Sequence, residues 1–410
     1  MDVVYKICCG IDVHKKKIVA CLRKGRKEEI KEFGTTSKEI RKMANWLKEN
    51  ECEMVAMEST SVYWKPLVNI FETECLDYMV VNAAEVKNRP GRKTDILDAQ
   101  WICELLQHGM LRASYIPTRE QRELRTACRY RQSLTQERAK ILNRLQDHLE
   151  GANIKLSTIV SDISGVTALQ LLDYVLNNEE LLDEAKAEEL IITRISAGVA
   201  EVVEAMDGIV TPFQKLMIKE VIEHLNALAI RIKKMDEIID EYMTEYQEAI
   251  ELLVQIPGIG RKSAEVILAE TGVDMSRFET AGHLAAWAGV SPGNNESAGK
   301  RRSVRSLKGN KTLKSTLVRS AMSGSKDKFS FFHAQKQRIA VRRGKKRANL
   351  AVAHSMLIAI YHMLKDGKDF VDLGADYYNQ FNTEKKANSY IKKLQSLGYH
   401  VTVTEVVAAT

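Results

Sequence analysis

The fold is decided by the N-terminal stretch Val3–Asp12, which reads VVYKICCGID. This stretch is apolar, rich in β-branched residues and ends in a carboxylate, a pattern that predicts a buried strand. Two further strands are expected at Lys17–Arg23 and Glu28–Thr35, close enough to the first to form hairpins. The chain is therefore expected to begin with a three-stranded meander whose first strand ends at Asp12.

After the meander, helices and strands are expected to alternate. The predicted elements are a helix from its N-cap Ser37 to Glu49, a strand at Glu53–Met57, a helix around Tyr63–Glu72, a strand at Tyr78–Asn82, and a helix from Asp95 to about His108 that Thr94 caps and Gly109 ends. The order β-β-β-α-β-α-β-α predicts an α/β domain of the RNase-H-like (RuvC-like) class over residues 1–115.

A helical region is expected to follow over residues 116–254. It begins with a polar helix at 118–150 and continues with short helices and loops before a long helix from Pro212 to about Val254. Apolar residues in the long helix alternate in steps of three and four, the heptad pattern of a coiled coil. An intersubunit coiled coil and an antiparallel hairpin with the 118–150 helix both satisfy this pattern.

The rest of the chain is expected to form a mainly helical C-terminal domain over residues 255–375 and an extension over 376–410. Residues 255–264, QIPGIGRKSA, are typical of a helix-hairpin-helix motif. The backbone N–H groups of its Gly-rich turn, at the start of a helix, suit a phosphate, and Lys262 adds positive charge.

Charge is distributed very unevenly along the 410 residues. The whole chain carries a net charge of +7, but residues 290–350 hold 17 Lys and Arg against two acids, which leaves the remainder at −8. A basic segment this dense indicates a polyanionic partner, DNA or RNA. The expected nucleic-acid contacts are Lys262, Lys300, Arg301, Arg302, Arg305, Lys308, Lys311, Arg342, Arg343, Lys345, Lys346 and Arg347.

Four carboxylates of the first domain are candidate metal ligands. Asp12 and Glu58 end two predicted strands, while Asp95 and Asp98 lie three residues apart on one helix face. In an RNase-H-like sheet these positions converge, and carboxylates gathered at one point repel unless hard cations neutralise them. Two Mg²⁺ ions there would suit an in-line phosphoryl displacement.

Other classes are disfavoured by what the sequence lacks. Actin-like and sugar-kinase ATPases also begin with a strand-end Asp on such a meander, but the Gly-rich phosphate loops that they need are not evident. The seven cysteines show no CxxC spacing, which argues against a disulfide framework or a zinc site. No apolar run is long enough for a membrane span and no signal peptide is evident, so a cytoplasmic location is expected.

Five motifs together resemble a known family, the DEDD-type insertion-sequence transposases of the "one-ten" family, which are bridge-RNA-guided recombinases. The motifs are GIDVH at 10–14, MEST at 57–60, KTDILDA at 93–99, IPGIG at 256–260, and a serine segment with Pro292, Ser297 and KGN at 308–310. The similarity spans nearly the whole chain, and the paired-aspartate motif at 93–99 is the most specific of the first three motifs.

This resemblance implies roles for individual residues. Asp12, Glu58, Asp95 and Asp98 would bind about two Mg²⁺ per composite site, and Ser297 would be the nucleophile that forms a phosphoserine link to DNA. It also implies a structured non-coding guide RNA that pairs with donor and target DNA. The protein would act as a dimer to tetramer, associated with the nucleoid of a bacterium or archaeon.

Two other functions remain open from the residues alone. The first is a RuvC-like nuclease that resolves branched DNA with the four carboxylates and no serine intermediate. The second is a non-catalytic DNA-binding protein that relies on the helix-hairpin-helix and the basic segment. Replacing Ser297 separates the first from the recombinase, and replacing Asp12 or Asp98 tests the second.

Overall fold

A computed structural model describes residues 3–59, 61–86, 94–178, 180–293, 296–297, 300–301, 306, 309–380 and 383–402. The chain divides into two compact units, Met1–Arg119 and Glu120–Thr410. The domain boundaries expected at residues 254 and 375 stay predictions.

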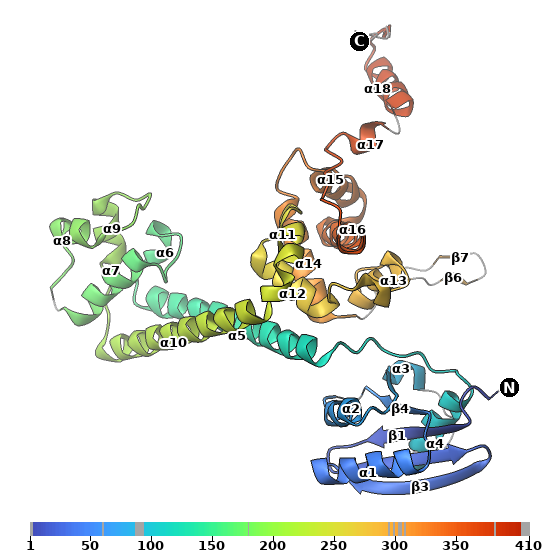
Figure 1. The fold of residues 1–410 in the computed structure, drawn as a ribbon. Coiled ribbons are helices and arrows are strands. Elements are labelled where there is room, and N and C mark those ends of the chain that lie inside the picture. The colour runs from blue at the N-terminus through green and yellow to red at the C-terminus, as the bar shows by residue number, and fades with distance from the viewer. Residues whose placement is uncertain are drawn as a thin grey trace. The chain divides into compact units, whose positions relative to one another are not determined.

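The N-terminal unit contains a five-stranded mixed sheet with the strand order β3-β2-β1-β4-β5 (Figure 1). β1 pairs antiparallel with β2 and parallel with β4, and β4 pairs parallel with β5. The strands are β1 (Ile7–Val13), β2 (Lys17–Lys24), β3 (Lys27–Gly34), β4 (Met54–Glu58) and β5 (Tyr78–Val81). The predicted α/β, RNase-H-like arrangement is confirmed.

The first strand is shorter than predicted at its start. It begins at Ile7 rather than Val3, because the backbone N–H groups of Val4 and Tyr5 donate to the carbonyl of Gln107 at 2.8 and 3.4 Å instead of joining the sheet. The first helix also differs in its cap. Thr36, not Ser37, is the N-cap, and its hydroxyl accepts from the backbone N–H of Glu39.

Helices cover both faces of the sheet. The helices of this unit are α1 (Ser37–Glu49), α2 (Trp64–Thr73), α3 (Ala83–Val86) and α4 (Asp95–Gln107). Because side chains alternate along a strand, Cys9 and Ile11 pack with α1 and α2, whereas Cys8 packs with α4. Gly10 faces α4 as well, at a point where a Cβ would come 2.3 Å from the backbone nitrogen of Cys103. Helix α4 therefore crosses β1 at the closest approach that glycine allows.

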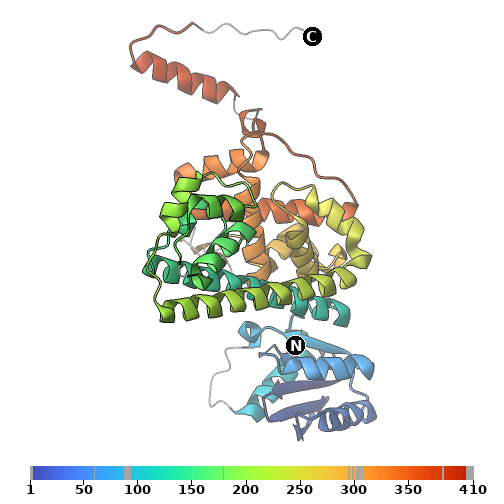
Figure 2. The ribbon, with the colours of Figure 1, turned by 90° about the vertical axis from the view of Figure 1, so that its left-hand side faces the viewer.

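The second unit is built on an antiparallel pair of long helices, α5 (Arg119–Gly151) and α10 (Pro212–Tyr242), which lie side by side in Figures 1 and 2. Gln214 donates to the carbonyl of Gly151 at one end of the pair, and Tyr242 donates to Glu123 at the other. The core that α10 shares with α5 and a lobe of short helices buries four apolar residues of the heptad pattern, Ile218, Val221, Leu225 and Leu228. The structure thus shows the hairpin arrangement of the two that the heptad pattern allows.

Four short helices complete that lobe: α6 (Leu156–Ile159), α7 (Val166–Asn177), α8 (Glu184–Leu190) and α9 (Val199–Met206). The long helix ends at Tyr242 rather than at Val254, where it was predicted to end. The hydroxyl of Thr244 donates to the carbonyls of Asp240 and Glu241, and a 3-10 turn at Thr244–Tyr246 separates α10 from α11 (Gln247–Val254). A local side-chain bond of this kind competes with helix continuation.

The remaining chain is mainly helical, as predicted. Its elements are α12 (Arg261–Thr271), a 3-10 turn (Met275–Arg277), α13 (Ala281–Ala288), a two-stranded hairpin of β6 (Glu296–Ser297) and β7 (Lys300–Arg301), α14 (Lys311–Gly324), α15 (Phe331–Arg343), α16 (Lys345–Asp366), α17 (Tyr377–Gln380) and α18 (Thr383–Ser396). Helix α16 is central and packs against α13, α14 and α15. Within the described residues, none of the helices combines the length and the apolar character that a membrane crossing requires.

Candidate active site

Two of the candidate carboxylates are brought to one edge of the sheet by strand register. Ile11 pairs with Met57 in the parallel β1–β4 ladder, so the next residues, Asp12 and Glu58, lie side by side at the carboxyl ends of their strands. Asp12 is 14% exposed at its side chain, and Glu58 is half-buried. The sequence alone predicted this adjacency.

Helix α4 delivers the other pair of carboxylates to the same edge. Thr94 caps α4 by accepting from the backbone N–H of Leu97, which starts the helix at Asp95. The close crossing over Gly10 places the first turn of α4 above the end of β1. Asp95 and Asp98, three residues apart, share the helix face toward Asp12, and the charges of both carboxylates raise its pKa.

His14, in the turn after β1, and Lys17, the first residue of β2, join this group. The Nε2 atom of His14 lies 3.0 Å from Oδ2 of Asp12 and 3.3 Å from Oδ1 of Asp95. The Nζ atom of Lys17 lies 2.7 Å from Oδ2 of Asp95. Asp95 therefore has a different partner on each of its two oxygens.

The two central aspartates have opposite electrostatic environments. Burial raises the pKa of Asp12, and the charges of Asp95 and Asp98 act in the same direction, while His14 opposes them. The hydrogen bond from Lys17 lowers the pKa of Asp95, and His14 adds to this effect. The charges of Asp95 and Asp98 thus disfavour ionisation of Asp12, and a bound cation would offset that cost.

The donor atoms of Asp12, His14 and Asp95 fit a divalent metal. One ligand atom from each residue lies within 4.8 Å of the others. A hydrogen bond joins Nε2 of His14 to Oδ2 of Asp12 at 3.0 Å, and Oδ1 of Asp95 lies 3.3 Å from the same nitrogen, so the three atoms are close enough to bind one ion. Carboxylate oxygens suit Mg²⁺ or Mn²⁺, and the imidazole nitrogen suits a transition metal such as Mn²⁺.

His14 and Lys17 were not placed in this group by the sequence analysis. The available signal was the two-residue period of strands. Cys8, Gly10 and Asp12 all face α4, so His14 continues the same face. Lys17 begins β2 on the face that Val19 shares, directly across the turn.

The serine segment and the basic residues lie in the second unit. Glu296–Ser297 pairs with Lys300–Arg301, so Ser297 is placed on a short hairpin. Of the predicted nucleic-acid contacts, Arg302, Arg305 and Lys308 lie outside the described residues. Lys311 is exposed at the start of α14, and an exposed basic corner forms where α15 meets α16 at Gly344. That corner contains Arg342, Arg343, Lys345, Lys346 and Arg347.

Comparison with known families identifies the lineage of the chain. A model for DEDD-type transposases matches residues 9–154, a range that includes all four carboxylates. A second model, described as "Transposase IS116/IS110/IS902 family", matches residues 250–337, which include the serine segment. This chain belongs to the IS110 family of transposases. The predicted family resemblance is confirmed.

Individual relatives are similar over shorter stretches. A "Pilin gene-inverting protein" of Moraxella bovis is 30% identical over 129 residues, 31% of this chain and 40% of the relative. The "Putative transposase y4pF/y4sB" of Sinorhizobium fredii is 23% identical over 286 residues, 69% of this chain and 64% of the relative. An uncharacterized IS110 insertion-element protein of Streptomyces coelicolor is 32% identical over 120 residues, 28% of this chain and 29% of the relative. The chain thus covers less than two thirds of each of these relatives.

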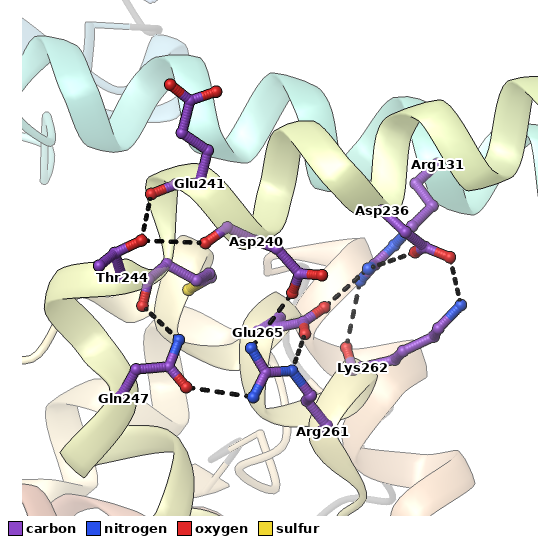
Figure 3. Close-up of polar contacts among 10 residues, drawn as sticks. Arg131, Asp236, Asp240, Glu241, Thr244, Gln247, Arg261, Lys262 and Glu265 are labelled. Atoms are coloured by element: carbon purple, nitrogen blue, oxygen red, sulfur yellow. Dashed lines mark hydrogen bonds and ion pairs between the residues drawn. The ribbon is translucent and has the colours of Figure 1, made fainter.

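Lys262, a predicted phosphate contact, makes an ion pair within the chain (Figure 3). Its Nζ lies 2.7 Å from Asp236 of α10, which also binds the buried Arg131 of α5 at 2.9 Å. The neighbouring Arg261 lies between Asp240 and Glu265, at 3.1 and 3.2 Å. These residues join α12 to the two long helices.

The Gly-rich turn before α12 serves packing in this structure. Gly258 has φ +88°, and a Cβ there would lie 2.3 Å from the carbonyl oxygen of Ser320 in α14. A glycine is required at this position both for its left-handed backbone and for the close approach of α14. The packing of this turn was not evident from the sequence, because Ser320 is distant along the chain.

Proposed function

We propose that this IS110-family member is a DNA recombinase that breaks and rejoins strands by metal-dependent phosphoryl transfer. The observation that carries the proposal is the convergence of Asp12, from the end of β1, with Asp95, from the start of α4, at a site with metal-binding geometry. A site of this kind suits an in-line displacement at a phosphodiester.

In this proposal Asp12, Glu58, Asp95 and Asp98 hold Mg²⁺, with about two ions in a complete site. When bound there, the cations would supply positive charge to stabilise the phosphoryl group as it is transferred. Asp12 and Asp95 anchor the site, supported by the distances that join them through His14. Lys17 orients the carboxylate of Asp95 by binding the oxygen that does not contact His14.

Ser297 is the proposed nucleophile. Its hydroxyl oxygen forms a bond to the scissile phosphorus, the bridging deoxyribose oxygen leaves, and the serine proton is passed to that oxygen, so one phosphoester replaces another. The reverse reaction with a new strand end restores the serine. The energy of the phosphodiester is conserved, and for this reason no nucleotide cofactor is needed. The placement of Ser297 on a hairpin inside the second family match supports this role.

The proposed partners are donor DNA, target DNA and a structured guide RNA. The exposed basic corner at the junction of α15 and α16 supports binding to phosphates, which would fix the position of the nucleic acid without reading bases. Sequence choice would then come from base pairing with the RNA. A dimer to tetramer is proposed as the active assembly. The name of the Moraxella bovis relative, a gene-inverting protein, is consistent with DNA rearrangement.

In the deciding experiment, the protein is purified together with the transcript of the DNA that flanks its gene. Recombination is then tested on DNA that matches this RNA. Wild type is expected to form a protein–DNA adduct in the presence of Mg²⁺. Ser297→Ala is expected to lose the adduct and recombination, and Asp12→Ala to lose both while nucleic-acid binding remains.

A metal-dependent nuclease is the second candidate, because the described carboxylate cluster lies wholly within the N-terminal unit. It predicts that Ser297→Ala cleaves DNA as well as wild type does. A non-catalytic DNA-binding protein is excluded if wild type transfers strands and Asp12→Ala does not.

A further inference from the structure

The serine segment, residues 289–310, begins after α13 and ends before α14 at neighbouring positions. The backbone N–H of Asn310, at the end of the segment, donates to the carbonyl of Trp287, just before its start, at 3.1 Å. A Cβ on Gly309 would lie only 2.4 Å from the backbone nitrogen of Gly289. The two ends of the segment are therefore in direct contact, and the Ser297 hairpin lies between them.

The contact between the two ends of the serine segment, which we call the base of the segment, is stabilised by a buried carboxylate. Glu270 of α12 is 0% exposed, and its Oε2 accepts a hydrogen bond from Nδ2 of Asn310 at 2.6 Å. The other side of the same amide, Oδ1 of Asn310, accepts from the backbone N–H groups of Thr312 and Leu313, each at 3.1 Å. Asn310 thus caps α14 and binds Glu270 at once, which fixes both its position and its rotamer.

The charge of Glu270 is balanced by two arginines of α5. Arg129 donates to both carboxylate oxygens, at 2.7 and 2.8 Å, in a bidentate pair. Arg125 lies 3.4 Å from Oε2 of Glu270, and its guanidinium lies over the ring of Trp287 with a centroid distance of 5.6 Å. Bidentate arginine–carboxylate pairs are both stronger and more directional than neutral hydrogen bonds. The base of the segment is therefore tied to α5, α12 and α13.

We infer that Glu270 is a positioning residue for the Ser297 hairpin, acting through Asn310. The inference rests on the proposed role of Ser297 as the nucleophile. Glu270 lies at the base and takes no part in the bond changes. Its effect is to fix where the hairpin emerges, and the position of a nucleophile is critical because an error of about 1 Å can reduce a rate about 100-fold.

The chain provides a matched control on the same helix. Glu265 of α12 is also buried, at 2% exposure, and also pairs with an arginine of α5, Arg131, at 2.7 Å. Its other ion-pair partner is Arg261, on the face toward α10. Both glutamates link α12 to α5, but the bond to Asn310 belongs to Glu270.

The experiment compares Glu270→Gln with Glu265→Gln in the full chain with its nucleic acids. Both variants are expected to melt at a lower temperature than wild type, because Glu265→Gln leaves the buried Arg131 partly uncompensated, and Glu270→Gln does the same to the partly buried Arg125. The Ser297–DNA adduct is expected to form about tenfold or more slowly in Glu270→Gln only, with Mn²⁺ and DNA binding unchanged. Equal adduct rates in the two variants would overturn the inference, whether both are fast or both slow.

Asn310→Ser provides a second variant that separates helix capping from the contact with Glu270. The hydroxyl of serine can still accept the N-cap hydrogen bonds. The serine side chain is too short to reach the carboxylate of Glu270, and it has no amide donor. Adduct formation is expected to slow as in Glu270→Gln, with faster hydrogen exchange in peptides that cover residues 306–315. If these peptides exchanged at the wild-type rate in Asn310→Ser, the inference would be contradicted. This result would not depend on whether Ser297 is the nucleophile. Absence of a serine adduct in the wild-type protein would instead refute the proposed function.

Discussion

The carboxylate of Asp95 is held on both sides, with Nζ of Lys17 at 2.7 Å from Oδ2 and Nε2 of His14 at 3.3 Å from Oδ1. The first contact leaves Oδ1 directed toward the site, where His14 also meets Asp12. A charged partner that orients a metal ligand from outside the coordination sphere is a common feature of metal sites. With this arrangement Asp12, His14 and Asp95 could bind one cation together.

His14→Ala is expected to change which divalent ion the site prefers. Imidazole nitrogen favours Mn²⁺ over Mg²⁺, so the variant should lose about tenfold in Mn²⁺ affinity and little in Mg²⁺ affinity. Calorimetric titration of each ion into the protein measures the difference. His224→Ala is the control, because His224 is an exposed histidine of the second unit, 3.7 Å from Glu137. An equal loss for both ions would rule out His14 as a ligand.

Asp12→Asn is expected to stabilise the metal-free protein although it removes activity. The pKa of Asp12 is raised in the folded state, chiefly by burial, so its ionisation opposes folding once the pH exceeds the ordinary value for aspartate. The free energy of unfolding of the variant should therefore exceed that of wild type by about 1 kcal/mol near pH 7. Near pH 3 the two free energies should be equal. Denaturant unfolding in EDTA at both pH values measures this. If the variant were less stable than wild type at pH 7, the conclusion that burial and neighbouring charges raise the pKa of Asp12 would be contradicted.

The N-terminal site could be predicted further from the sequence than the rest of the molecule. A strand-end Asp12, a strand-end Glu58 and the capped pair Asp95 and Asp98 follow from local patterns, because strand period and helix capping are short-range effects. His14 follows from the same period, but a lone histidine beside an aspartate is commonplace, so the pattern did not single it out.

Long-range contacts were beyond sequence reasoning. The sequence around Lys262 does not predict that Asp236 of α10 is its partner, and the sequence around Asn310 does not predict the contact with Glu270. The end of α10 at Tyr242 coincides with hydrogen bonds from the Thr244 hydroxyl to the last turn of the helix, within an otherwise continuous apolar repeat. Interactions of this kind are settled by tertiary packing, which a single sequence does not display.

Gly10→Ala is expected to damage both stability and activity. The new Cβ would lie 2.3 Å from the nitrogen of Cys103 and 2.4 Å from the carbonyl oxygen of Ala99, and backbone atoms of α4 cannot move aside cheaply. Overpacking of this kind costs about 1–3 kcal/mol and would shift Asp95 relative to Asp12. Thermal melting and Mn²⁺ titration measure the two effects. Gly34→Ala is the control, since its Cβ would meet only the flexible side chain of Glu39, at 3.1 Å.

Asp236→Asn is expected to weaken the joint between α10 and α12. Although burial acts in the opposite direction, hydrogen bonds from Lys262 and Arg131 lower the pKa of Asp236 in the folded state. The stabilisation that follows is fully present above the ordinary pKa of aspartate and is lost as the pH falls through the lowered value. The variant should be less stable by about 1–2 kcal/mol at pH 7, and the difference should disappear in strong acid. A constant difference from pH 7 to pH 2 would contradict this linkage.

Replacing Lys345, Lys346 and Arg347 together with Gln is expected to reduce the salt dependence of nucleic-acid binding. These side chains are exposed at the start of α16, and each phosphate contact that they make releases counterions when it forms. A plot of log affinity against log salt concentration should become shallower by about 2 to 3, because each lost contact removes about 0.7–0.9 from the slope. Replacing Lys186, an exposed lysine that pairs with Glu189 of α8 at 2.7 Å, should leave the slope unchanged. If the triple variant retains the wild-type slope, the corner between α15 and α16 makes no phosphate contacts, and binding must rest on the basic residues around Ser297.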